Sequence, residues 1–198
     1  MDAHLAQVFT RLGGEFRVDG EDFGARLQKI RAFVFDWDGV FHAGRKGPSA
    51  PNGFSEADSM GTNMLRFSHW LQHARLPLMA IITGENNPPA LELARRECFH
   101  AVYSGSKFKK VAFEHFCNLH QLRFEEVVFV FDDILDLSIS ELCGLRIMIR
   151  RDASPLFVQY AQEHALYDYL TAMTPDGHAI REACELMIGT VGNYATAI

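Results

Sequence analysis

The 198-residue sequence predicts an α/β fold built around a doubly wound parallel sheet. Three observations predict it: short unbroken apolar runs, helical segments between those runs, and acidic residues directly after two of them. Unbroken apolar runs of this length are typical of strands buried on both faces. Strands that alternate with helices imply right-handed crossovers, with helices on both faces of the sheet.

Six apolar runs account for the strands. They cover residues 32–35, 78–82, 101–103, 127–131, 146–149 and 167–170. Helices are expected between them. Met64, Phe67 and Leu71 recur at helical spacing, and prolines at positions 88 and 89 suit the first turn of the next helix. Further helices are expected to begin near residue 154 and to cover 178–188.

One more helix is predicted over residues 107–118. Ser106 precedes it as a capping residue, and Val111 and Phe116 are expected to point into the core.

The chain divides into three parts by composition. Residues 1–30 are glycine-containing and weakly helical, and we expect an N-terminal helical arm docked on the main domain. Residues 31–190 carry the alternating pattern and form that domain. Within it, the glycine- and proline-rich stretch 40–56 is predicted to form a β-hairpin flap at the carboxyl edge of the sheet. Residues 191–198 form a C-terminal tail.

Composition excludes several classes of protein. The formal net charge of −6 argues against a nucleic-acid-binding protein, which usually has a basic face. No apolar stretch approaches the ~20 residues of a membrane span, and the first residues lack the pattern of a signal peptide. Four widely spaced cysteines are typical of reduced thiols, so a cytoplasmic location is expected. His69 and His73 are four residues apart, but no acidic residue completes the H-E-x-x-H motif of zinc sites. They are therefore expected to be a surface pair.

Acidic side chains follow two of the predicted strands. Because the carboxyl ends of parallel strands share one edge, residues after different strands should meet there. The side chains expected at this edge are Asp36, Asp38, Thr83, Asp132, Asp133 and Asp136. Several carboxylates this close require compensation, and Mg²⁺ prefers a few carboxylates together with substrate phosphate.

This group suits phosphoryl transfer. One carboxylate of the pair Asp36 and Asp38 can attack phosphorus and form an aspartyl-phosphate, while the other exchanges a proton with the leaving oxygen and then with water. Thr83 can donate a hydrogen bond to a phosphoryl oxygen through its hydroxyl or its backbone N–H. Lys109 can supply a positive charge where negative charge develops.

Four stretches of the sequence resemble, in order, the four motifs of haloacid dehalogenase (HAD) superfamily phosphatases. They are FVFDWDGVF (33–41), IITG (81–84), Lys109 and VFDDILD (130–136). Within that superfamily the sequence is similar to the capless 3-deoxy-D-manno-octulosonate 8-phosphate (KDO 8-P) phosphatase group. The shared features are the short segment after the first motif, a helix beginning near Phe54 to Asp58, Tyr103 with Gly105, and the late stretch 179–184.

This resemblance implies residue roles. Asp36 would be the nucleophile and Asp38 the general acid and base. Asp36, the Asp38 backbone carbonyl and Asp132 would hold Mg²⁺, and Thr83 and Lys109 would bind the phosphoryl group. The remaining residues, expected behind the metal ligands or beside the substrate, are Gly84, Asp133, Asp136 and Asp58. The group also implies no large cap domain and a homotetramer whose neighbouring subunits close the site.

Three positions and one loop depart from the group's pattern. Glu85 and Ala57 stand where two arginines are usual, Phe131 replaces the glycine of the fourth motif, and the glycine-rich loop is reduced to residues 175–178. The residues expected to carry out the reaction are present, but the two arginines that would bind the carboxylate of an acidic sugar are replaced. We therefore expect a Mg²⁺-dependent phosphomonoesterase acting on a small phosphorylated metabolite, a sugar phosphate resembling KDO 8-P. The alternatives are a phosphorylated signalling receiver domain and a non-catalytic metal-binding assembly or regulatory protein of the same fold.

Overall fold

The computed structural model describes residues 1–45 and 53–197. Its described part contains one seven-stranded sheet in the order β1-β7-β6-β5-β2-β3-β4. All neighbouring strands are parallel except β1 and β7, which pair antiparallel at one edge. The strands are β1 (Glu15–Phe16), β2 (Ala32–Phe35), β3 (Leu78–Ile82), β4 (Ala101–Tyr103), β5 (Val127–Phe131), β6 (Leu145–Met148) and β7 (Tyr169–Leu170).

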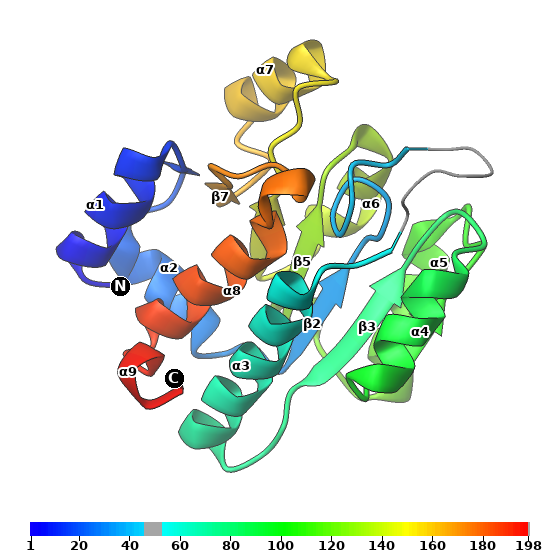
Figure 1. Ribbon diagram of the computed structural model, residues 1–198, viewed down its shortest axis with the longest axis horizontal. Coiled ribbons are helices and arrows are strands. Elements are labelled where there is room, and N and C mark those ends of the chain that lie inside the picture. The colour runs from blue at the N-terminus through cyan, green and yellow to red at the C-terminus, as the bar shows by residue number, and fades with distance from the viewer. Residues whose placement is uncertain (46–52, 198) are drawn as a thin grey trace.

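Helices cover both faces of this sheet (Figure 1). Helices α1 (Ala3–Leu12), α2 (Gly20–Leu27), α3 (Glu56–His73), α4 (Pro88–Arg96) and α8 (Ala179–Thr190) contribute to one apolar core. Helices α5 (Lys109–Leu119), α6 (Leu137–Ser140) and α7 (Pro155–Glu163) contribute to the other. Helix α9 (Tyr194–Ala197) follows α8 near the end of the chain. The predicted doubly wound α/β architecture is confirmed.

Strand β2 explains why the predicted runs are unbroken. Phe33 and Phe35 point into the first core, whereas Ala32 and Val34 point into the second. Successive side chains of a strand alternate between faces, and here both faces are covered by helices. Every position must therefore be apolar, and all four of these residues are buried.

The first 30 residues pack against the same sheet. Strand β1 extends it by pairing with β7, and Phe23 and Leu27 of α2 are buried in the first core. In Figure 1, α1 and α2 lie beside α8. The sequence did not predict β1, because a strand of two residues is too short to display a period.

Two local predictions were wrong. Helix α5 begins at Lys109 with Phe108 at its N-cap, and Val111 is 65% exposed rather than inward-facing. The buried face of α5 is centred on Phe113 and Phe116, which places Val111 on the opposite side of the helix at 100° per residue. His69 is not at the surface either: its ring is buried and lies within hydrogen-bonding distance of the carbonyls of Ile30 and Arg75.

The predicted flap, 40–56, is only partly described. Residues 46–52 lie outside the described residues, so the hairpin stays a prediction. Before them, an isolated bridge joins Asp38 to His42, and after them α3 begins at Glu56 with Ser55 as its N-cap. Residue 198 of the predicted tail also lies outside the described part. Among the described helices, none is both long and apolar enough to cross a membrane.

Candidate active site

The site lies at the carboxyl edge of the two central strands. Strands β2 and β5 pair in parallel, with Phe35 opposite Val130, and the backbone N–H of Asp36 donates to the Val130 carbonyl at 2.9 Å. This register places Asp36 beside the residues that follow β5, which include Asp132. The chain leaves β2 toward β3 on one side while β5 lies on the other, so this edge is a topological switch point, where ligands of open α/β sheets bind.

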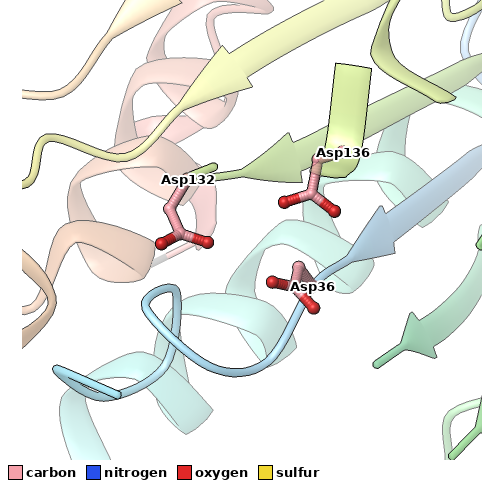
Figure 2. A group of neighbouring side chains, drawn as sticks. All are labelled: Asp36, Asp132 and Asp136. Carbon is pink, nitrogen blue, oxygen red and sulfur yellow. The ribbon is translucent and has the colours of Figure 1, made fainter. Parts of the chain in front are cut away.

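Three carboxylates converge at this edge, as Figure 2 shows. Asp36, Asp132 and Asp136 are buried, and each offers an oxygen within 4.8 Å of the others. Asp136 reaches the group because a short 3₁₀ helix, Ile134–Asp136, turns the chain back after β5. Among the described residues, Asp132 Oδ1 and Asp136 Oδ2 are buried without a hydrogen-bond partner. Buried carboxylate oxygens are almost always paired, so this donor set fits a hard divalent cation.

Two basic side chains partly compensate the negative charge. Lys109 Nζ lies 2.8 Å from Asp36 Oδ1 and 2.6 Å from Asp136 Oδ1. Arg151 Nη1 lies 2.5 Å from Asp132 Oδ2. Burial alone would lower the pKa of Lys109, but the charges of Asp136 and Asp36 outweigh burial and raise this pKa. Lys109 is therefore a fixed positive charge within the carboxylate group.

The carboxylates are held away from water and close to one another. Burial raises the pKa of Asp36, Asp132 and Asp136 to about 7 each, and the neighbouring carboxylates add to the effect. Lys109 and Arg151 oppose the shifts without cancelling them. Near neutral pH, any further positive charge in the site would favour the ionised carboxylates that a cation and a nucleophile require.

The raised pKa values predict an unusual pH dependence of stability. Because the folded pKa values lie above the unfolded value of 3.8, the folded state binds more protons between pH 4 and about 7. The contribution of this group to stability is therefore present at low pH and is lost as pH rises through about 7. In the absence of divalent cations, we expect the Tm of the wild-type protein to fall more between pH 5 and 8 than the Tm of Asp132→Asn.

Differential scanning calorimetry in EDTA, repeated with Mg²⁺, measures this difference. Bound Mg²⁺ should remove most of the pH dependence from the wild-type protein and little from the variant. Equal slopes for the two proteins in EDTA would contradict the assigned carboxylate coupling.

A polar network surrounds Asp38 and Thr83. The amide nitrogen of Asn87 donates to Asp38 Oδ2 and to Thr83 Oγ1, both at 2.8 Å. His42 Nε2 lies 3.4 Å from Asp38 Oδ1. The backbone N–H of Thr83 donates to the Tyr103 carbonyl, so only the Thr83 hydroxyl is left to donate to a phosphoryl oxygen. The network fixes the orientation of Asp38 at the mouth of the site.

Gly39 is required by geometry rather than by flexibility alone. Its φ is +87°, a region that other residues rarely adopt. A Cβ at this position would overlap both Arg151 Nη1 and Asp132 Oδ2. The glycine of the first motif therefore allows the loop after β2 to approach the carboxylates closely.

Most predicted site residues line one pocket of about 240 Å³. Those brought together are Asp36, Asp38, Thr83, Gly84, Lys109, Asp132, Asp133 and Asp136. Asp133 is exposed at the rim, and its carboxylate accepts from the backbone N–H of Ile134. The structure does not bring Asp58 into this pocket. Asp58 is buried beside a separate hollow, where its carboxylate binds Ser55 and the backbone N–H of Arg181.

Sequence reasoning missed two polar residues of the site. Arg151 lies three residues beyond β6 and pairs with Asp132, and Asn87 connects Asp38 with Thr83. Arg151 stands in an apparently ordinary basic pair, and Asn87 precedes two prolines as a helix start would. One signal in the sequence could have identified Arg151 and Asn87: each of them follows a predicted strand, at the edge of the sheet that carries the acids.

The fold and the residues at this edge are similar to those of HAD superfamily phosphatases. The chain has homologues of that kind. It is 27% identical over 181 residues to the 3-deoxy-D-manno-octulosonate 8-phosphate phosphatase of Escherichia coli (strain B / BL21-DE3), covering 89% of this chain and 88% of the relative. No family model matches the sequence.

Solved structures of similar proteins agree. The 3-deoxy-D-manno-octulosonate 8-phosphate phosphatase of Yersinia pestis superposes with a TM-score of 0.70 at 26% identity, covering 86% of each chain. The enzyme of the same name from Moraxella catarrhalis, solved with magnesium, phosphate and KDO, gives a TM-score of 0.74 over 89% of this chain and 95% of that one. At 22% identity, this second likeness supports the fold alone.

Proposed function

We propose that this protein is a Mg²⁺-dependent phosphomonoesterase that hydrolyses a small phosphorylated sugar resembling KDO 8-P through an aspartyl-phosphate on Asp36. The observation that carries the proposal is the carboxylate of Asp36, which lies within 2.8 Å of Lys109 and beside two further carboxylates in a pocket that also holds Asp38 and Thr83. The homologues named as phosphatases support the same reaction. The pocket volume of about 240 Å³ suits a phosphoryl group with a small sugar partly outside.

The residues divide the chemistry between them. The Asp36 carboxylate attacks phosphorus, the bond from phosphorus to the ester oxygen breaks, and Asp38 gives its proton to the departing oxygen. Asp38 then takes a proton from water as the water attacks the aspartyl-phosphate, which releases phosphate and restores Asp36. Lys109 and the Thr83 hydroxyl bind the phosphoryl oxygens. Mg²⁺, held by Asp36, Asp132 and the Asp38 backbone carbonyl with Asp136 close by, would neutralise charge on the phosphoryl group.

A panel of phosphate esters assayed with and without Mg²⁺ tests this function. Phosphate release that requires Mg²⁺ and turns over repeatedly supports it. A single phosphorylation of Asp36 that persists for hours would favour the receiver domain instead. Tight Mg²⁺ binding without hydrolysis of any ester would favour the non-catalytic metal-binding protein.

The pocket rim bears on the sugar. Glu85 and Asp133 line the pocket as exposed carboxylates, and Glu85 has no ion-pair partner among the described residues. The octulosonate of KDO 8-P carries a carboxylate of its own, which like charges at the rim would repel. We therefore expect phosphates of sugars that lack a carboxylate to be better substrates than KDO 8-P.

Replacement of Glu85 by arginine is expected to shift this preference. One charge near a partly exposed site is worth ~1 kcal/mol, and Glu85→Arg exchanges a like charge for an opposite one. The ratio of kcat/KM for KDO 8-P to that for the phosphate of a sugar without a carboxylate should therefore rise ~5-fold or more. Glu85→Gln should give an intermediate ratio. Glu92→Arg, an equal charge change on the exposed side of α4, is the matched control and should leave the ratio unchanged. An unchanged ratio in Glu85→Arg would remove Glu85 from substrate selection.

We also propose that the protein is a cytoplasmic homotetramer. Apolar side chains are exposed along α3, among them Met60, Phe67 and Trp70, which a neighbouring subunit would cover. Light scattering of the purified protein measures the assembly directly, and a monomer at micromolar concentration would contradict this part of the proposal.

A further inference from the structure

Arg151 touches the metal site in a way that phosphate chemistry does not require. Its side chain is mostly buried, and Nη1 donates to Asp132 Oδ2 at 2.5 Å. Its other terminal nitrogen, Nη2, donates to the Ala43 carbonyl at 3.3 Å. One guanidinium thus joins a carboxylate after β5 to the loop that follows β2.

The surrounding backbone is shaped for this side chain. Gly39 leaves space that a Cβ would take from Arg151 Nη1, and Gly44 lies against the same guanidinium. The preceding residue, Arg150, is anchored through its backbone N–H and Nε to Thr171 at 2.9 and 2.8 Å, and through Nη2 to Glu15. The chain is therefore fixed immediately before Arg151, which limits where its side chain can reach.

The two oxygens of Asp132 are used differently. Oδ2 accepts from Arg151, whereas Oδ1 is buried with no partner among the described residues. A carboxylate held through one oxygen presents the other in a fixed direction. Groups that orient metal ligands in this way commonly change metal affinity 10–100-fold when they are removed.

We propose that Arg151 is a positioning residue of the metal site: it holds Asp132 through Oδ2, so that Oδ1 is available to the cation, and it fixes the loop of residues 39–44 beside the same site. The inference rests on the proposed function, because it assumes that the carboxylates bind Mg²⁺. A planar guanidinium with two donors aimed at different acceptors performs this task better than an ammonium group.

Charge and position predict opposite effects, which makes the inference testable. Arg151 is a cation beside a cation site, so removing its charge alone would tighten Mg²⁺ binding. Losing the orientation of Asp132 would weaken it. We therefore expect Arg151→Met to bind Mg²⁺ 10–100-fold more weakly than wild type, despite the lost repulsion.

Isothermal titration of Mg²⁺ into the substrate-free proteins measures the effect. Arg151→Lys, which keeps the charge but only one of the two contacts, should bind with intermediate affinity. Arg45→Met is the matched control: Arg45 is exposed near the same loop and pairs with Asp176, so its loss should change Mg²⁺ affinity by less than about 2-fold. Circular dichroism tests whether each variant is folded. If Arg151→Met does not fold, the Mg²⁺ affinity of Arg151→Lys decides the role of Arg151.

The outcomes distinguish a failure of the role proposed for Arg151 from a failure of the proposed phosphatase function. Equal or tighter Mg²⁺ binding by a folded Arg151→Met, with wild type hydrolysing phosphate esters in Mg²⁺, overturns the role of Arg151 and leaves the phosphatase intact. For Arg151→Lys standing alone, wild-type affinity overturns the role and weaker binding supports it. A wild-type protein that binds no Mg²⁺ overturns both proposals.

Discussion

Replacement of Asp36 by asparagine is expected to abolish hydrolysis, with kcat reduced by about 10³-fold or more, while the protein stays folded. The amide is isosteric with the carboxylate but is a far weaker nucleophile toward phosphorus. The fold should persist because the change removes a negative charge from a buried site where burial and Asp132 already raise the pKa of Asp36 to about 7. Steady-state phosphate release and a thermal melt in EDTA measure the two parts of this prediction.

Asp38→Asn is the matched comparison. Asp38 lies in the same pocket, held by Asn87, and is expected to move protons rather than to attack. With 4-nitrophenyl phosphate, whose leaving group needs little protonation, Asp38→Asn should still phosphorylate Asp36 and then accumulate the phosphoenzyme, because water attack lacks its base. Mass spectrometry of acid-quenched samples detects the added phosphoryl group. Phosphoenzyme in Asp36→Asn, or wild-type turnover by that variant, would refute Asp36 as nucleophile.

Replacement of Lys109 by methionine is expected to have the largest effect on stability. Lys109 pairs with Asp36 at 2.8 Å and with Asp136 at 2.6 Å, and all three side chains are largely buried. Removing the cation leaves two buried carboxylates without their partner, which costs about 3–5 kcal/mol. Activity should fall by about 10²-fold or more, since a charge that binds the phosphoryl oxygens is lost as well.

Urea unfolding at pH 8 in EDTA measures this cost, because the carboxylates can escape it by protonation at lower pH. Adding Asp136→Asn to Lys109→Met should restore part of the stability and none of the activity. Lys107→Met, an exposed lysine two residues earlier, controls for loss of a charge in this segment. If the single Lys109 variant proves as stable as the Lys107 control, the ion pairs assigned to Lys109 are not formed in solution.

The sequence was informative about the site because strand ends are local features. Asp36 follows the four apolar residues of β2, and an unbroken apolar run indicates a strand that is buried on both faces. Asp132 follows β5 in the same way. Parallel pairing of β2 with β5 then brings the two acids together without any further information.

Other local predictions were incomplete where a distant partner decided the outcome. The backbone N–H of Thr83 looked available for phosphate, yet it pairs with Tyr103 of β4. His69 is predicted to be a surface residue, yet its ring is buried, and Nε2 lies 3.2 Å from the carbonyl oxygen of Ile30, which precedes β2. Tyr103 is 20 positions from Thr83, and Ile30 is 39 positions from His69.

The sequence alone predicted six of the seven described strands, all but β1, and the edge of the sheet that carries the acids, because apolar runs and their ends are visible in consecutive residues. Only the tertiary structure decided that Arg151 holds Asp132, that Asn87 joins Asp38 to Thr83, and that Asp58 lies elsewhere. Arg151 and Asp132 are 19 positions apart, Asn87 and Asp38 are 49 positions apart, and the geometry of these contacts depends on how the loops pack over the sheet. Side-chain type limits which contacts are possible, but packing selects which of them form.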